Sequence, residues 1–331
     1  MKIGIISDVH RYPEGAAAII ARIHALGIVD RLILNGDIGE SGENFEESVA
    51  FSERILHAAG ETGLETYVQP GSHEALIPYQ YAIDTSSARY SNLIDCLRTP
   101  CIDVAGRKLI FLPGSDIVAS GQFHLGSELA SGRYIRTEFG TYSATHALLQ
   151  RFLDQNIAHE EMEYRNIGDL ETMIQDPARD IVICHVPARF DVGPQGVDFA
   201  YFATSEKGLI PGVVLEAQIQ AYVQREHGRN AHAEEVERIA QGNGYTFHRE
   251  NVGNKALRDL FDRLGVRYAI NGHIHESGHH AHDRDGNPVP DKTSLSELFW
   301  NSGCFDQGQM GILTLDDTRV SYHNVSLTSS L

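Results

Sequence analysis

The 331-residue chain has no apolar run that approaches the roughly 20 residues of a membrane-spanning helix, so we expect no membrane contact. The apolar run IGIIS near the first residue is too short for a signal peptide. Cysteine is scarce, and its positions form neither a CxxC pair nor a disulfide framework. Free thiols in a reducing cytoplasm are the simplest explanation, so we expect a cytoplasmic protein. The four cysteines are Cys96, Cys101, Cys184 and Cys304.

Positive charge is scarce as well. The chain has 27 lysine and arginine residues against 45 aspartate and glutamate residues, which gives a net charge of −18. A negative field of this size repels polyanions, and no Lys/Arg run provides a local exception, so long nucleic acid is a less favoured partner. The GxxxxGK(S/T) phosphate loop and the GxGxxG dinucleotide fingerprint are also missing. Nothing therefore indicates a P-loop ATPase or a Rossmann enzyme.

The sequence does contain five short apolar runs, each of which ends abruptly in polar residues. Short runs rich in Ile, Val and Leu, with almost no alternation, are typical of strands that are buried on both faces. Helix-like segments at 16–26, 45–59 and 255–264 separate some of these runs. Alternating strands and helices favour an α/β fold with a mainly parallel sheet. The runs are KIGIIS (2–7), RLILN (31–35), LETYVQ (64–69), DIVIC (180–184) and VRYAIN (266–271).

Each apolar run leads directly into side chains that can bind a metal ion. Ligands of parallel sheets bind beyond the carboxyl ends of the strands, so we expect the five turns to converge on one crevice. Carboxylates and imidazoles gathered in this way predict a metal site. Nitrogen and oxygen donors without thiolate favour Mn, Fe, Zn, Ni or similar ions. The converging residues are Asp8, His10, Asp37, Ser72, His73, His185, His273 and His275.

The number of candidate ligands exceeds what one tetrahedral ion can bind. Two ions that share a carboxylate and lie roughly 3.5–4 Å apart fit the set better. The pairs Asp8–His10 and His273–His275 each consist of residues two apart. On extended backbone such side chains point the same way, so each pair is expected to address one centre.

The ordered motifs DVH, GD, GSHE, H and GHIH resemble those of the calcineurin-like metallophosphoesterase superfamily. They run from Asp8 to His275 and so cover most of the chain. The resemblance implies the metallo-dependent phosphatase fold, a four-layer α/β/β/α sandwich of two mixed β-sheets. It also implies two divalent transition-metal ions. The first ion would be held by Asp8, His10, Asp37 and His275, and the second by Asp37, residue 72, His185 and His273.

In the family that this chain resembles, the aspartate at position 37 would bridge the two ions. His73 would face the phosphate and donate a proton or a hydrogen bond to the leaving oxygen. Ser72 departs from the family pattern GNHE or GNHD, whose asparagine amide oxygen ligates the second metal. A serine hydroxyl is shorter and a poorer neutral ligand, so we expect a second site that is weaker or tuned to another ion. Glu74 is expected to fix the turn through hydrogen bonds.

The resemblance implies a metal-dependent phosphoric ester hydrolase. Such an enzyme would hydrolyse a phosphodiester, slightly preferred, or a phosphomonoester by attack of a metal-bridging hydroxide on a small substrate. A nuclease and a non-catalytic metal-binding scaffold remain alternatives; the negative charge argues against the first, and the retained His73 against the second. Arg11 and Arg189 are candidates for substrate phosphate contacts, with ordinary salt-bridged arginines as the competing interpretation.

We expect a single domain over residues 1–331, with insertions at about 117–165 and 188–254. Insertions at the active-site end of a sheet shape substrate access, or they provide packing or a homo-oligomer surface; the two interpretations are equally open. The last segments, 298–305, 310–317 and 319–327, are expected to form antiparallel strands of the second sheet. A metal-binding tract at 279–282 is the less favoured interpretation of the histidines there.

Overall fold

The computed structural model describes residues 1–116, 121–316 and 318–327. One of its two large sheets, sheet A, has the strand order β19-β18-β1-β2-β3-β4. Strands β1 to β4 are parallel, whereas β18 pairs antiparallel with both β1 and β19. The strands are β1 (Lys2–Ile6), β2 (Arg31–Asn35), β3 (Thr66–Gln69), β4 (Leu93–Asp95), β18 (Gln309–Leu315) and β19 (Val320–Ser326).

The other large sheet, sheet B, has the strand order β16-β17-β15-β11-β6-β5. Its four middle strands are parallel, and the two edge strands are antiparallel to their neighbours. Both large sheets are therefore mixed. The strands are β5 (Cys101–Val104), β6 (Arg107–Leu112), β11 (Ile181–Cys184), β15 (Tyr268–Asn271), β16 (Ala281–His282) and β17 (Leu298–Asn301).

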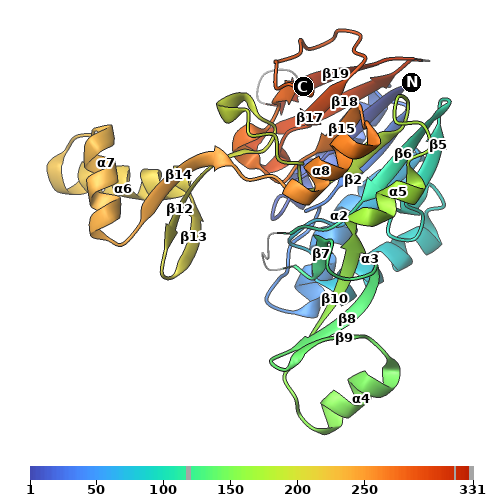
Figure 1. Cartoon of the computed structure of the whole chain (residues 1–331), viewed down its shortest axis with the longest axis horizontal. Helices are drawn as coiled ribbons and strands as arrows, with labels where there is room; N and C mark the ends of the chain where they lie inside the picture. Colours follow the sequence, from blue (N-terminus) through green and yellow to red (C-terminus); the bar gives the residue numbers. More distant parts are fainter. Residues whose placement is uncertain (117–120, 317, 328–331) are drawn as a thin grey trace.

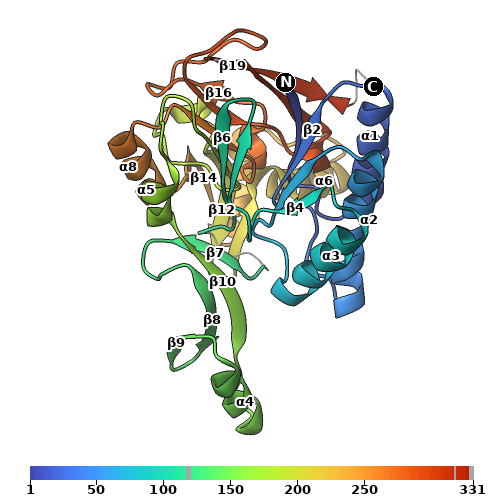
Figure 2. The same ribbon diagram turned by 90° about the vertical axis from the view of Figure 1, so that its right-hand side faces the viewer.

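Three apolar clusters hold the layers together. Side chains of sheet A, such as Ile5 and Ile33, pack against Phe111 and Ile183 of sheet B in the cluster between the sheets. The opposite face of sheet A packs on α1 (Pro13–Ala25), α2 (Phe45–Thr62) and α3 (Leu76–Arg89). The opposite face of sheet B packs on α5 (Leu170–Met173) and α8 (Lys255–Leu264). Helices therefore lie along both outer sides of the two mixed sheets (Figure 2), which is consistent with the expected metallo-dependent phosphatase fold.

This layering explains the continuous apolar runs of the sequence. Side chains alternate across a strand, so Ile5 faces the other sheet while Ile6 faces the helices, and both must be apolar. Two predicted helix ends are confirmed, and each is marked by a glycine with a positive φ. Gly27 (φ 60°) lies just beyond α1, and Gly265 (φ 72°) caps α8.

Two expectations about the sheets were wrong. The five predicted strands do not share one sheet, because β1, β2 and β3 belong to sheet A while β11 and β15 belong to sheet B. The last strands also divide between the sheets. Strand β17 pairs parallel with β15, whereas β18 and β19 extend sheet A. The chain passes from one sheet to the other through the short segment 302–308, which apolar patterning does not reveal.

The first insertion forms a four-stranded sheet of order β7-β10-β8-β9. It extends away from the sandwich as an arm with α4 at its tip (Figures 1 and 2). Residues 117–120 of the predicted insertion lie outside the described part. The elements are β7 (Phe123–Gly126), β8 (Gly132–Thr137), β9 (Gly140–Ser143), α4 (His146–Asp154) and β10 (Glu160–Asn166).

The second insertion forms a lobe at the left of Figure 1, separate from the arm of the first insertion, which points to the bottom of that view. A three-stranded sheet of order β13-β12-β14 packs with two helices around a small core of its own, which includes Leu215 and Val223. The description as a single domain with two insertions stays a prediction. The elements are β12 (Phe199–Ser205), β13 (Gly208–Pro211), α6 (Gly212–His227), α7 (Ala233–Gly242) and β14 (Thr246–Asn251).

No helix among the described residues combines the length and the apolar character that crossing a bilayer would require.

Candidate metal centre

The structure gathers the predicted ligands at the carboxyl ends of strands from both sheets. Their carboxylates and imidazoles, together with Cys304 and Asp306, form overlapping groups of three, within each of which one ligand atom per residue lies within 4.8 Å of the others. Asp8 and His10 follow β1, Asp37 follows β2, Ser72 and His73 follow β3, His185 follows β11, and His273 and His275 follow β15.

The backbone at these positions is not extended, which corrects the argument from residue spacing. Asp8, His10, Asp37 and His273 have φ values of 57°, 52°, 49° and 68°, in the left-handed region that non-glycine residues rarely adopt. The chain turns sharply as soon as each strand ends, and these turns aim the side chains at the cluster. Such conformations persist where surrounding contacts fix them, and they are frequent at functional sites.

One half of the cluster is built around His275. Its Nε2 atom lies 3.4 Å from Asp8 Oδ1 and 3.3 Å from His10 Nε2. Asp8 is fully buried and is held by the Ser7 hydroxyl, which donates to Oδ2 at 2.6 Å, and by the backbone N–H of His273. Three potential ligand atoms therefore face one small space, which is a fitting environment for a cation.

The other half is built around Asp37. Its Oδ1 accepts hydrogen bonds from the backbone N–H groups of Ser72 (2.6 Å) and His73 (2.9 Å). Its Oδ2 accepts from the Ser72 hydroxyl at 2.9 Å and lies 3.1 Å from Nε2 of His185. The Ser72 hydroxyl is also 3.5 Å from Nδ1 of His273. Asp37 thus contributes to the groups on both sides of the cluster.

His185 provides the clearest sign that a cation belongs here. Its ring is fully buried, and Nδ1 lies 3.0 Å from the carbonyl oxygen of Asn35. A carbonyl only accepts, so Nδ1 carries the proton. Nε2 faces Asp37 Oδ2 at 3.1 Å, an ion pair that requires a proton on Nε2 and that lacks a well-aligned hydrogen bond. A metal ion between the nitrogen and the carboxylate would replace that proton and satisfy both groups.

Glycine is required at Gly36 and Gly71 for this packing. A Cβ at Gly36 would overlap the His185 ring, and a Cβ at Gly71 would overlap Asp37 Oδ1 and lie 2.7 Å from His185 Nε2. The turns therefore approach the ligands more closely than any side chain allows.

The electrostatics of the cluster follow from burial and charge. Burial opposes ionisation of Asp37, but the positive charge of His185 outweighs it and holds the pKa of Asp37 well below its usual range. Burial likewise disfavours the charged forms of His185 and His275. The charge of Asp37 raises the pKa of His185 to about 9, and hydrogen bonds from His275 to Asp306 and Asp8 raise the pKa of His275 to about 11. Burial, followed by the charge of His185, lowers the pKa of His273 to about 3. The cluster thus retains protons that a metal ion would replace.

His73 lies beside the cluster and is only partly buried. Its ring packs edge-on against His10 with centroids 4.6 Å apart, and burial lowers its pKa. The ring is therefore largely neutral at pH 7 and can donate a hydrogen bond through N–H.

The expected role of Glu74 is confirmed. The oxygens of its buried carboxyl group accept hydrogen bonds from the backbone N–H groups of Ile38 (2.7 Å) and Gly71 (2.9 Å), so it ties the turns after β2 and β3 together. Burial, followed by the charge of Asp37, raises the pKa of Glu74 to about 8.

The two arginines proposed for substrate contacts form ion pairs at 2.7 Å, Arg11 with Glu40 and Arg189 with Asp191. Substrate contact through either remains a prediction. The histidines of the 279–282 segment bond to backbone groups: His279 to Met310, His280 to Gly196, and His282 to Asp283 and Val197. These contacts agree with the structural interpretation of that segment.

Sequence reasoning missed two residues of the cluster, Asp306 and Cys304. Asp306 Oδ2 lies 3.2 Å from Nδ1 of His275, and Cys304 groups with Asp8 and His275. Burial raises the pKa of the Cys304 thiol well above its usual value, so the group is a neutral thiol. The available signal was the apolar run LFWN, which ends in polar residues as the other five runs do.

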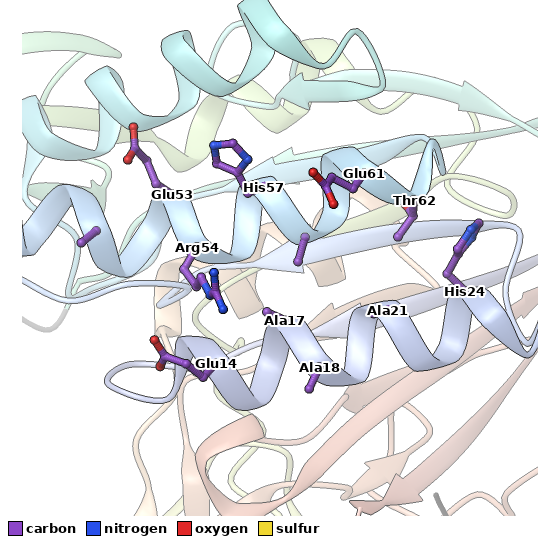
Figure 3. Close-up of a pocket in the computed structure, with 12 residues that line it drawn as sticks. Glu14, Ala17, Ala18, Ala21, His24, Glu53, Arg54, His57, Glu61 and Thr62 are labelled. Carbon is purple, nitrogen blue, oxygen red and sulfur yellow. The ribbon is translucent and has the colours of Figure 1, made fainter.

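A separate groove of about 820 Å³ lies between α1 and α2 (Figure 3). Alanines such as Ala17 and Ala21 form part of its lining, together with charged side chains that include Glu53 and Arg54. None of the predicted site residues lines this groove.

The sequence model of a protein family described as calcineurin-like phosphoesterase matches residues 1–197 of the chain. The match includes every candidate ligand up to His185, whereas His273 and His275 lie beyond it. A search of curated proteins gave no match.

Similar solved structures include two from Thermus thermophilus. The structure described as TT1561 has 10% identity and a TM-score of 0.47, over 98% of each chain. The structure described as a hypothetical protein has 12% identity and a TM-score of 0.38, over 99% of this chain and 100% of that one. A further crystal structure has 15% identity and a TM-score of 0.49, over 97% of this chain and 98% of that one. Similarity at this level carries no information about substrate.

Proposed function

The chain belongs to the calcineurin-like phosphoesterase family, and from that premise we propose that it is a two-metal-dependent phosphoesterase that hydrolyses a small phosphate ester. A phosphodiester is the favoured substrate and a phosphomonoester the alternative. The family is one of metal-dependent phosphoesterases, and the described residues include groups that can hold metal ions. The two-ion mechanism and the identity of the substrate go beyond the family match and are our proposal.

The observation that carries the proposal is the place of Asp37. Its carboxylate groups with His10 and His73 on one side and with His185 and His273 on the other. A carboxylate in this position can contribute one oxygen to each of two ions. Asp8, His10 and His275 would complete the first ion's ligands, and Ser72, His185 and His273 those of the second. The oxygen and nitrogen donors suit Mn, Fe, Zn or Ni.

When bound, two such ions would acidify a water molecule and neutralise the charge that develops on the phosphoryl oxygens. The chain's own residues prepare the site for this chemistry. Two backbone N–H groups fix Asp37 Oδ1, the Asn35 carbonyl fixes the tautomer of His185, and Glu74 holds the two turns in register.

His73 is placed to act on the substrate. Its backbone N–H is bonded to Asp37, so the ring is carried by the same turn that orients the shared carboxylate. Its side chain is more exposed than Asp8, Asp37 and His185; the neutral ring can donate a hydrogen bond to the leaving oxygen, and the protonated ring could donate a proton. A non-catalytic scaffold would have no need of such a group.

The positions of the insertions support a small substrate. The first insertion begins after β6 and the second after β11, and these strands are neighbours whose carboxyl ends belong to the site edge. Both insertions therefore arise beside the metal centre. With a net charge of −18 the surface disfavours a long polyanion, and the two ions would provide the local positive charge that a phosphate needs.

The test is hydrolysis of bis-p-nitrophenyl phosphate and p-nitrophenyl phosphate by protein stripped of metal and then reloaded with Mn²⁺ or Ni²⁺. We expect activity only after reloading, with the diester preferred. Asp291→Asn is a matched control, since that surface carboxylate pairs with His323 at 3.0 Å outside the cluster. Reloaded protein that binds metal but hydrolyses neither ester would support the scaffold alternative.

A further inference from the structure

The turn after β17 brings a sixth strand end to the metal centre. The short helix η4 (Phe305–Gln307) lies against the end of β1. The backbone N–H of Phe305 donates to the carbonyl oxygen of Ser7 at 2.9 Å, and that of Asp306 donates to the carbonyl oxygen of Asp8 at 3.0 Å. These two bonds fix Asp306 relative to a candidate ligand through the backbone alone, so the position does not depend on the Asp306 side chain.

The carboxylate of Asp306 lies beside the ring of His275, in a group in which one ligand atom each of His10, His275 and Asp306 lies within 4.8 Å of the others. Its Oδ2 lies 3.2 Å from Nδ1, while Nε2 of the same ring points to Asp8 and His10. The other oxygen, Oδ1, is buried and has no hydrogen-bond partner in the part of the chain that the structure describes. The carboxylate of Asp306 therefore pairs at 3.2 Å with the Nδ1 atom of a candidate metal ligand.

We propose that Asp306 is a positioning residue that accepts the Nδ1 proton of His275 and thereby presents the Nε2 lone pair to the first metal ion. The inference rests on the proposed two-metal function. An imidazole that ligates through Nε2 must carry its proton on Nδ1, and a carboxylate partner both fixes this tautomer and makes Nε2 a stronger donor.

His185 and His275 are oriented by different partners. His185 is oriented by the neutral carbonyl of Asn35, at 3.0 Å from Nδ1, whereas His275 is oriented by a charged carboxylate. A neutral carbonyl thus fixes the tautomer of His185, and a charged carboxylate, which is a stronger hydrogen-bond acceptor, fixes that of His275. Loss of Asp306 should therefore weaken the site that contains His275 and leave the site that contains His185 unchanged.

The experiment is calorimetric titration of metal-free wild-type, Asp306→Asn and Asp306→Ala proteins with Mn²⁺. We expect one of the two ions to bind about 10–100-fold more weakly to the variants, with the affinity of the other ion and the melting temperature of the metal-free protein unchanged. Asp291→Asn is the matched control, because it removes the charge of another carboxylate that contacts a histidine Nδ1, at 3.0 Å. That variant should bind both ions as the wild type does.

A second readout reports the tautomer directly. In zinc-loaded protein with ¹⁵N-labelled histidine, long-range ¹H–¹⁵N spectra should show His275 protonated at Nδ1 in the wild type and a change in that signal in Asp306→Ala. Two outcomes overturn the inference alone: unchanged affinity for both ions, or equal loss at both sites with a lower melting temperature. A wild-type chain that binds no ion would overturn the proposed function, and the inference with it.

Discussion

Replacing Ser72 by asparagine should strengthen the second metal site. Ser72 is 2% exposed, and its hydroxyl donates to Asp37 Oδ2 at 2.9 Å while lying 3.5 Å from Nδ1 of His273. The hydroxyl proton is therefore directed at a carboxylate oxygen that the second ion would also use. Only a lone pair of a short neutral group remains for the ion, whereas an asparagine would extend an amide oxygen toward it.

The magnitude follows from the change of one ligand among several. We expect the second ion to bind about 10–100-fold more tightly to Ser72→Asn, since altering a single contact in a metal site has effects of this size. Each factor of ten corresponds to about 1.4 kcal/mol of binding free energy. The matched control is Ser72→Ala, which removes the hydroxyl without adding a ligand. It should weaken the second ion and lower the free energy of unfolding of the metal-free protein by about 1–2 kcal/mol, because Asp37 loses a buried hydrogen bond.

The assay is calorimetric titration of the three proteins with Mn²⁺, together with the metal concentration that gives half of the maximal rate. Wild-type activity should continue to rise after the first equivalent has bound, and Ser72→Asn should reach its full rate at a lower metal concentration. Equal second-site affinities in wild type and Ser72→Asn would refute the reasoning, since the serine, or a water that it holds, would then already be an adequate ligand.

Asp37→Ala should remove both ions and the activity together, because this carboxylate belongs to the ligand groups on both sides of the cluster. Metal analysis after dialysis measures the loss of the ions. A variant that retained two ions would contradict the bridging role. His73→Ala should keep both ions but lose about 10²–10⁴-fold in rate, as expected for an acid–base or hydrogen-bonding group, and loss of an ion would show that its assignment is wrong. Gly71→Ala should lower the free energy of unfolding by about 1–3 kcal/mol in denaturant titrations, since the new Cβ would overlap Asp37 and lie 2.7 Å from His185 Nε2. An unchanged free energy of unfolding would mean that the turn can relax.

The positions of the candidate ligands could be predicted because they follow local patterns. A strand buried on both faces requires a continuous apolar run, and each of the five runs stops where the chain leaves the sheet. Sequence patterning therefore located Asp8, Asp37 and His185 at strand ends without any knowledge of the tertiary structure. The carboxyl ends of parallel strands meet at one edge, which predicted their convergence.

The division of these strands between two sheets could not be predicted from the runs themselves. Ile5 of sheet A and Ile183 of sheet B are equally apolar and pack in the same cluster, so neither sequence indicates its sheet. The left-handed backbone at Asp8 and Asp37 could not be predicted from the sequence either, because it depends on contacts made after the sheets have assembled. The conclusion that residues two apart share a direction on extended backbone was wrong for the same reason.

Asp306 was missed because its role depends on contacts between distant parts of the chain. It lies in a turn whose N–H groups bond to the end of β1, near the opposite end of the sequence. Only the tertiary structure places its carboxylate beside His275. The internal sheets of the two insertions could not be predicted either, since exposed strands such as β9 have no continuous apolar run.

The most direct test of the central claim is an anomalous diffraction measurement on crystals of the wild-type protein grown with Mn²⁺. The account predicts two peaks, roughly 3.5–4 Å apart, on either side of the Asp37 carboxylate. One should lie among Asp8, His10 and His275, and the other beside His185 and His273. No peak at Asp37, or peaks only at sites away from these side chains, would contradict the account.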